Sequence, residues 1–196
     1  MSVAIINDIF SDKDLEHIRT TIANLDLEVD VHLGRSRIKQ NINLTGMMNP
    51  KIIDRFYDIA KDLGETSLVI SGITCVEYSN LYGKPNLPPH FDGDNNDLII
   101  NMQIDSNTVW PLGLNLNVYE LKNNSALIFN PNKEVHWRTH KEFKDGEYVK
   151  MMFVRFCNLD NLSDYSHLRL SQDDPVFKDA RDIRESYPQV DRLTIS

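Results

Sequence analysis

The sequence has no long apolar run, only two cysteines and no excess of basic residues. No apolar stretch approaches the ~20 residues that a helix needs to cross a bilayer, so we expect no membrane partner. The N-terminal residues lack a basic region and a cleavage site, so we expect no signal peptide and a cytoplasmic location. The net charge of −8 argues against nucleic acid as a partner.

The two cysteines, Cys75 and Cys157, both stand in apolar, strand-like runs. Such positions favour buried free thiols, although the sequence also allows a disulfide between them. A length of 196 residues with 41% hydrophobic residues suits one globular domain, residues 1–196, with a substantial core.

Three segments have apolar residues at helical spacing behind a helix-start signal. The predicted helices cover residues 12–24, 50–63 and 175–186. Their start signals are a capping box at Ser11 and Asp14, the pair Asn49-Pro50, and the pair Asp174-Pro175.

Short runs rich in Val, Ile and Thr, separated by turn signals, dominate from Ser67 onward. The predicted strands cover residues 3–10, 68–78, 98–104, 112–121, 126–129 and 148–157, and residues 27–44 add two strands or a strand with a loop. This pattern predicts an α+β, β-rich fold with an antiparallel barrel or sandwich core. We expect an N-terminal strand and helices in residues 1–66, the barrel core in 67–157, and a tail and helix in 158–196.

A candidate metal site lies in the sequence Pro-Pro-His90-Phe-Asp92 and in a later run, Val135-His136-Trp137-Arg138. His90 and Asp92 are two residues apart, so on an extended backbone they project from the same face. A later imidazole would complete two histidines and one carboxylate, the facial set of non-haem Fe(II) sites. His140 competes with His136, but His140 falls in a polar segment typical of a solvated loop. On spacing alone, a hydrogen-bonding His90 and an ordinary turn acid at Asp92 explain the motif equally well.

The run from Tyr82 to Asp92, YGKPNLPPHFD, resembles the segment before the first iron ligands in 2-oxoglutarate and Fe(II)-dependent dioxygenases of the prolyl-hydroxylase-like type. Trp110-Pro111-Leu112 and His136-Trp137-Arg138 are similar to a pattern in small bacterial and phage-type members. The resemblance covers about residues 75–156. It implies a double-stranded β-helix, of jelly-roll or cupin-like shape, with Fe(II) held by His90, Asp92 and His136. It also implies 2-oxoglutarate as the co-substrate and O₂ as the oxidant.

The resemblance further implies a basic side chain for the far carboxylate of 2-oxoglutarate. We predict Lys150 for this role, because it stands in an otherwise apolar strand and a lysine on an apolar face needs an anion. Arg138 and Arg155 are the alternatives, with Arg155 ranked last because it lies on the opposite strand face from Lys150. Tyr82 is the predicted hydroxyl donor to the same carboxylate, and Tyr78 is the second choice.

The expected activity is hydroxylation of an amino-acid, peptidyl or other small carboxylate-bearing substrate, with 2-oxoglutarate converted to succinate. Asp92 argues against a halogenase, because the halogenases that resemble this family replace this carboxylate with a small residue. Arg35 and Arg37 are weak candidates for substrate binding, although such alternation also suits the exposed face of an edge strand. Asn95, in an Asp/Asn-rich turn, is a further weak candidate.

Two other classes of protein remain open. A cupin-like metal-dependent enzyme that uses no keto acid predicts no response to 2-oxoglutarate. A non-catalytic binding module on the same barrel predicts that no metal binds. Desaturation and ring closure use the same ligand set as hydroxylation, and the oligomeric state stays open.

Overall fold

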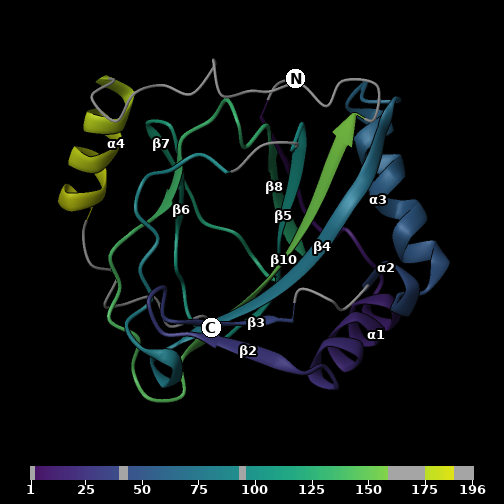
Figure 1. Ribbon diagram of the computed structural model, residues 1–196, viewed down its shortest axis with the longest axis horizontal. Coiled ribbons are helices and arrows are strands. Elements are labelled where there is room, and N and C mark those ends of the chain that lie inside the picture. Colours follow the sequence, from purple (N-terminus) through teal and green to yellow (C-terminus); the bar gives the residue numbers. More distant parts are fainter. Residues whose placement is uncertain (1–2, 40–43, 93–95, 159–174, 188–196) are drawn as a thin grey trace.

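The computed structural model describes residues 3–39, 44–92, 96–158 and 175–187, and it has two β-sheets that face each other (Figure 1). The strands of the larger sheet, in spatial order, are β1 (Ala4–Ile6), β8 (Ser125–Phe129), β5 (Leu98–Ser106), β10 (Tyr148–Asn158), β4 (Leu68–Ser79), β3 (Arg35–Ile38) and β2 (Leu27–Asp30). The smaller sheet has the order β7 (Asn117–Tyr119), β6 (Leu112–Leu114) and β9 (His136–Arg138). Every pairing between these strands is antiparallel.

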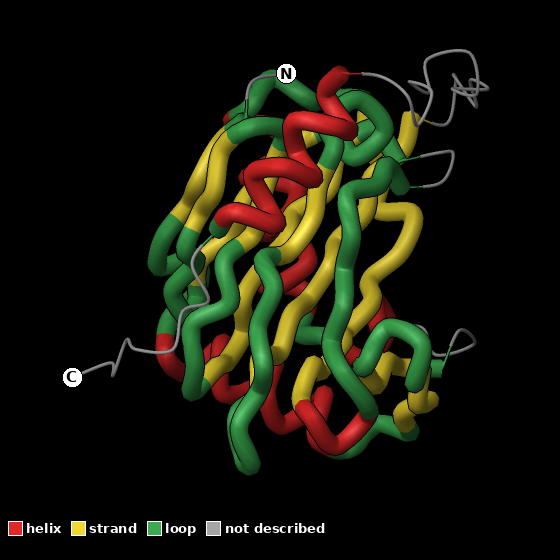
Figure 2. The backbone as a smooth tube through the Cα atoms, turned by 90° about the vertical axis from the view of Figure 1, so that its left-hand side faces the viewer, coloured by secondary structure: helices red, strands yellow, loops and turns green. Residues whose placement is uncertain are grey.

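Helices cover the outer faces of both sheets. The helices α1 (Asp12–Ala23) and α3 (Pro50–Asp62) pack on the larger sheet, and α2 (Leu44–Met47) precedes α3. The predicted caps form, because Ser11 accepts a hydrogen bond from the N–H of Asp14 and Asn49 accepts one from that of Lys51. Helix α4 (Pro175–Ser186) lies across the smaller sheet (Figure 2), and a short 3₁₀ turn, η1 (Asn80–Tyr82), follows β4.

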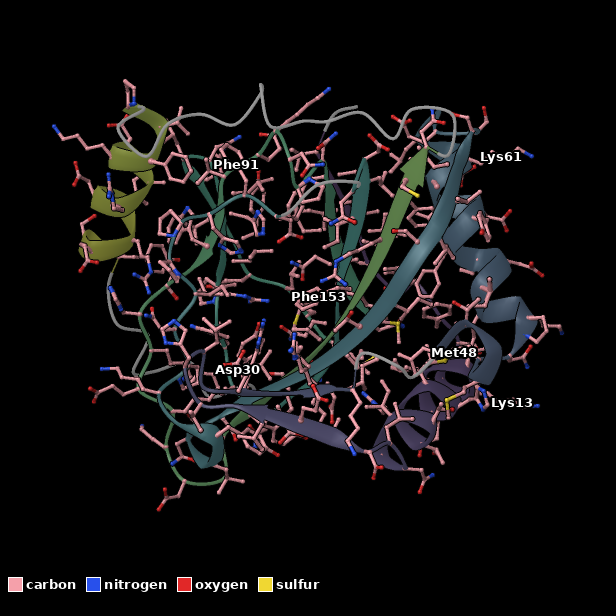
Figure 3. The ribbon with its side chains drawn as sticks, viewed as in Figure 1. Lys13, Asp30, Met48, Lys61, Phe91 and Phe153 are labelled. Carbon is pink, nitrogen blue, oxygen red and sulfur yellow. The ribbon has the colours of Figure 1, made fainter. Side chains whose placement is uncertain are left out.

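The central strands of the larger sheet, β8, β5, β10 and β4, bury side chains on both faces. On β10, Met152 and Val154 belong to the core beneath α1 and α3. Met151 and Phe153 point the other way, and Phe153 packs with Leu112 and other residues of the smaller sheet. Figure 3 shows Phe153 on the side of β10 that faces the smaller sheet. Each central strand therefore separates a helix-covered layer from the space between the sheets.

The α+β, β-rich class and the N-terminal helices on one sheet are confirmed. The prediction of a single strand over residues 112–121 is wrong, because the chain reverses between β6 and β7. Asn115 has a φ of 50°, in the left-handed region that asparagine tolerates better than most residues, and this permits the tight turn.

Helix α2 was not predicted. Cys75 and Cys157 are buried free thiols, as expected. Within the described ranges, no helix has both the length and the apolar character that crossing a bilayer requires.

Candidate metal centre and its surroundings

Three predicted ligands, His90, Asp92 and His136, converge on one point, with one donor atom from each lying within 4.8 Å of the others. The distance from Asp92 Oδ1 to His136 Nε2 is 3.4 Å, and the distance to His90 Nε2 is 3.8 Å. No other group of three or more potential ligands occurs among the residues that the structure describes. Two imidazoles and one carboxylate are the donor set that suits Fe(II) and related divalent ions with open coordination positions.

Backbone hydrogen bonds bring the two histidines together. The N–H of His90 donates to the carbonyl of His136 at 3.1 Å, and the N–H of His136 donates back at 3.0 Å. The N–H of Arg138 donates to the carbonyl of Leu87, so the segment before Asp92 runs alongside β9. The two prolines at 88 and 89 fit this extended path because proline disfavours helix in the residue before it.

The imidazole rings are held with their Nε2 atoms toward Asp92. His90 Nδ1 lies 2.7 Å from the carbonyl oxygen of Pro88, and His136 Nδ1 lies 3.2 Å from that of Glu134. A carbonyl oxygen only accepts, so each Nδ1 is a donor, and Nε2 is the ring nitrogen that each histidine can offer to a metal. The ring of His136 also lies 5.2 Å from the ring of Phe129, which shields it from water.

Burial, with a contribution from the charge of His136, lowers the pKa of His90 to about 4. For Asp92, burial acts to raise the pKa, but the hydrogen bond and charge of His136 outweigh it and the pKa falls to about 2. At neutral pH His90 is therefore neutral and Asp92 is ionised. These are the protonation states that metal ligation requires.

His140, the rival third ligand, lies away from this cluster. Its Nε2 is 2.9 Å from an oxygen of Glu185 on α4. The preference for His136 over His140 therefore agrees with the geometry.

Lys150, predicted to bind the far carboxylate of 2-oxoglutarate, does not face the space between the two sheets. Lys150 forms an ion pair with Glu77 at 3.3 Å and lines a cavity together with residues of α1, so it lies on the helix side of the larger sheet. Tyr82 lies near Lys150, because the Tyr82 hydroxyl is 3.4 Å from the other carboxylate oxygen of Glu77. Lys150 does share its face with Met152 and Val154, as the strand pattern indicated, but that face belongs to the helix-covered core.

Arg138 is the basic side chain that the structure places deep between the sheets. It is two residues beyond His136 on the same face of β9 and is only 2% exposed. Its guanidinium donates to the carbonyl of Trp110, contacts Met151 Sδ at 3.3 Å and lies 5.1 Å from the centre of the Trp110 ring. Tyr78 packs against the same ring at 4.9 Å.

No carboxylate of the described residues pairs with Arg138. Burial lowers its pKa to about 10, although Tyr78 acts to raise it, so the guanidinium stays charged at neutral pH. A buried cation without a counter-ion is costly, which makes this position a candidate anion site.

Arg155, ranked last from the sequence, lies on the inner face of β10, where it packs with Phe153. Its Nη1 donates to the hydroxyl of Thr74 at 2.7 Å, and its charge acts to lower the pKa of Asp92. Arg35 and Arg37 line a cavity with Arg155.

Asn95 lies outside the described residues. The polar pair Asn101 and Gln103 also faces inward, and the Oδ1 of Asn101 is buried with no hydrogen-bond partner among the described residues.

No protein-family model matches the sequence, and no curated protein matches it significantly. Solved structures match along most of the chain. HygX from Streptomyces hygroscopicus, solved with nickel and 2-oxoglutarate bound, has a TM-score of 0.61 at 9% identity, covering 80% of this chain and 83% of HygX.

Two further structures show the same similarity. SnoN, a non-haem α-ketoglutarate-dependent epimerase of nogalamycin biosynthesis, has a TM-score of 0.62 at 9% identity, covering 80% of this chain and 78% of SnoN. A prolyl hydroxylase from Trichoplax adhaerens, in complex with a hypoxia-inducible-factor peptide, has a TM-score of 0.56 at 11% identity, covering 86% of this chain and 87% of the other. The chain therefore has the double-stranded β-helix fold of the 2-oxoglutarate and Fe(II) oxygenases. The fold class expected from the resemblance is confirmed.

Proposed function

We propose that this protein is an Fe(II)- and 2-oxoglutarate-dependent oxygenase. The observation that carries the proposal is the convergence of His90, Asp92 and His136 within 4.8 Å on a double-stranded β-helix. In this proposal Nε2 of each histidine and a carboxylate oxygen of Asp92 hold the ferrous ion. Bound Fe(II), 2-oxoglutarate and O₂ together supply an oxidant that attacks a C–H bond, with release of succinate and CO₂.

Arg138 is the proposed partner for the far carboxylate of 2-oxoglutarate. It follows His136 by two residues on the inner face of β9, so its guanidinium lies deeper in the barrel than the metal ligands. A co-substrate carboxylate would supply the missing counter-ion and accept charge-assisted hydrogen bonds. Tyr78, 1% exposed and on the inner face of β4, is the proposed neighbour in place of Tyr82. This proposal replaces Lys150, whose ammonium lies beyond the larger sheet.

The remaining inner side chains exclude water from the metal centre. Phe129 packs on His136, while Leu112 and Leu114 form an apolar wall with it. An apolar wall keeps solvent and stray reductants away from a reactive metal site. The proposed reaction is hydroxylation of an amino-acid, peptidyl or other small carboxylate-bearing substrate in the cytoplasm.

Anaerobic titration of the protein with Fe(II) and then 2-oxoglutarate tests this function. We expect a visible metal-to-ligand charge-transfer band that appears only when both are present, followed by succinate when O₂ is admitted. His136→Ala should remove the band and His140→Ala, the matched control, should retain it. Metal binding without any response to 2-oxoglutarate would contradict the proposal and favour a metal-dependent enzyme of the cupin type.

A further inference from the structure

A cavity of about 250 Å³ opens on the inner face of the larger sheet, between β3, β4 and β10. Its lining includes Arg35, Arg37 and Lys39 from the β3 segment, Thr74 from β4, and Phe153 and Arg155 from β10. The basic residues of β3 do not protect an exposed sheet edge, because β2 pairs along that side. The alternative interpretation of this run as the exposed face of an edge strand is therefore wrong.

The charged side chains that line the cavity are all cationic. The lining contains four cationic side chains and, among the residues that the structure describes, no acidic one. Arg35, Arg37 and Lys39 do approach acids of the β2 segment, at 3.6, 3.9 and 3.4 Å, but those acids lie outside the lining. Three acids thus face four cations, and the cavity keeps a net positive charge, because Arg155 forms no ion pair with a described residue.

Hydrogen-bond donors also remain available. The Nε atoms of Arg35 and Arg37 are buried and make no hydrogen bond to any described residue. Arg155 donates to the hydroxyl of Thr74 and has no carboxylate in contact with it among the described residues. A bound anion would therefore meet, in Arg155, a guanidinium group that no described carboxylate neutralises.

Sheet register links the cavity to the metal centre. Arg155 of the lining pairs with Ile99 on β5, Ile99 pairs with Phe129 on β8, and the ring of Phe129 lies 5.2 Å from that of His136. Within the cavity the half-buried ring of Phe153 offers an apolar surface, with the Arg155 guanidinium 5.9 Å from its centre. An occupant with a charged end near Arg37 could place a hydrocarbon portion over Phe153, toward the metal ligands.

We propose that this cavity binds the anionic group of the primary substrate, and that the substrate is a small organic acid with a short hydrocarbon portion. A volume of about 250 Å³ is below the ~300–1,000 Å³ of drug-sized ligand sites, which favours a small molecule. Arg37 and Arg155 are the proposed specificity residues. The proposal rests on the oxygenase function and narrows it to acidic substrates bound at a place separate from Arg138.

A matched pair of probes, 3-phenylpropionate and its uncharged amide 3-phenylpropanamide, tests the charge preference on the full chain. With Zn(II)-loaded protein, calorimetry should show the acid binding about ten-fold or more tightly than the amide. Arg37→Met and Arg155→Met should each weaken the acid about five-fold or more and leave the amide unchanged. Lys61→Met, which removes one charge from α3 on the far side of the larger sheet (Figure 3), is the matched control and should change neither.

The location is tested by loading the protein with Mn(II), which should broaden the NMR signals of the bound acid. Equal affinity for both probes, no binding of the acid, or binding that neither arginine variant weakens would overturn the proposal. An effect of Arg37→Met on 2-oxoglutarate affinity as large as its effect on the acid would also overturn it, because the cavity would then be the co-substrate site. If the wild type fails to bind 2-oxoglutarate, the proposed function fails, while the comparison of the probes still decides the nature of the cavity.

Discussion

His90 and His136 exchange two backbone hydrogen bonds, each donating its N–H to the carbonyl of the other, at 3.1 and 3.0 Å. Their imidazole rings consequently stand side by side, with centroids 4.1 Å apart. Backbone pairing thus fixes the relative positions of the two proposed metal ligands in the folded chain.

Removal of one proposed ligand should weaken metal binding strongly. We expect His136→Ala to weaken Fe(II) or Zn(II) affinity by about a hundred-fold or more, because it removes one of three donors. His140→Ala should leave the affinity unchanged, since His140 pairs with Glu185. Calorimetric titration with Zn(II) measures both. Equal losses in the two variants would show that the ligand set is wrong.

Replacement of Arg138 should weaken co-substrate binding without lowering the stability of the fold. Arg138→Met removes a buried charge that lacks a counter-ion, so the free energy of unfolding should stay equal or rise. The same variant should lose about ten- to a hundred-fold in 2-oxoglutarate affinity while metal affinity is retained. Urea denaturation and the charge-transfer titration provide the two measurements.

Lys150→Met is the control for Arg138→Met. Its ammonium pairs with Glu77 on the helix side of the larger sheet, so 2-oxoglutarate affinity should not change. A loss in Lys150→Met together with an intact response in Arg138→Met would reverse the assignment.

Arg184 ties α4 to the metal-binding strand. Its Nε donates to the carbonyl of Arg138 at 2.8 Å, and its Nη2 donates to Asn86, in the segment that leads to His90. Arg184→Ala should lower the free energy of unfolding by about 1.5–3 kcal/mol, the usual contribution of hydrogen bonds to a charged group. Lys178→Ala, an exposed change on the same helix, should have no effect in the same urea experiment.

Gly113 leaves the space that Trp137 occupies. A Cβ at this position would lie 2.0 Å from the indole ring, so the ring or the strand would have to move. Gly113→Ala should cost about 1–3 kcal/mol, as overpacking does, and should weaken metal binding because Trp137 follows His136 directly. Near-UV circular dichroism reports the displaced indole. An unchanged spectrum with unchanged stability would mean that the strand adjusts without strain.

The convergence of the three predicted ligands could be anticipated because strand alternation and motif spacing act locally. His90 and Asp92 project together from an extended segment, and His136 opens a short strand, and all three features can be read without a fold. The expectation that Lys150 faces the barrel interior failed for a physical reason. Lys150 shares an apolar face with Met152 and Val154, but β10 buries two apolar faces, and alternation does not say which one meets the barrel interior.

The same ambiguity ranked Arg155 last, although it lies on the inner face. The strand predicted over residues 112–121 failed differently, since Asn115 was interpreted as a strand residue when its left-handed backbone begins a reversal. Each outcome depended on how the segment packs in the folded chain, which the local sequence pattern does not contain.

The ligands and the cationic cavity belong to different parts of the molecule. His90, Asp92 and His136 come from β9 and the segment paired with it, whereas Arg35, Arg37 and Arg155 come from the opposite sheet. Side chains on β3 can therefore be exchanged without changing the backbone that holds the proposed ligands. In the proposed oxygenase, substitutions on this one wall would change substrate selectivity and leave the metal site intact, which makes β3 the place to begin redesigning selectivity.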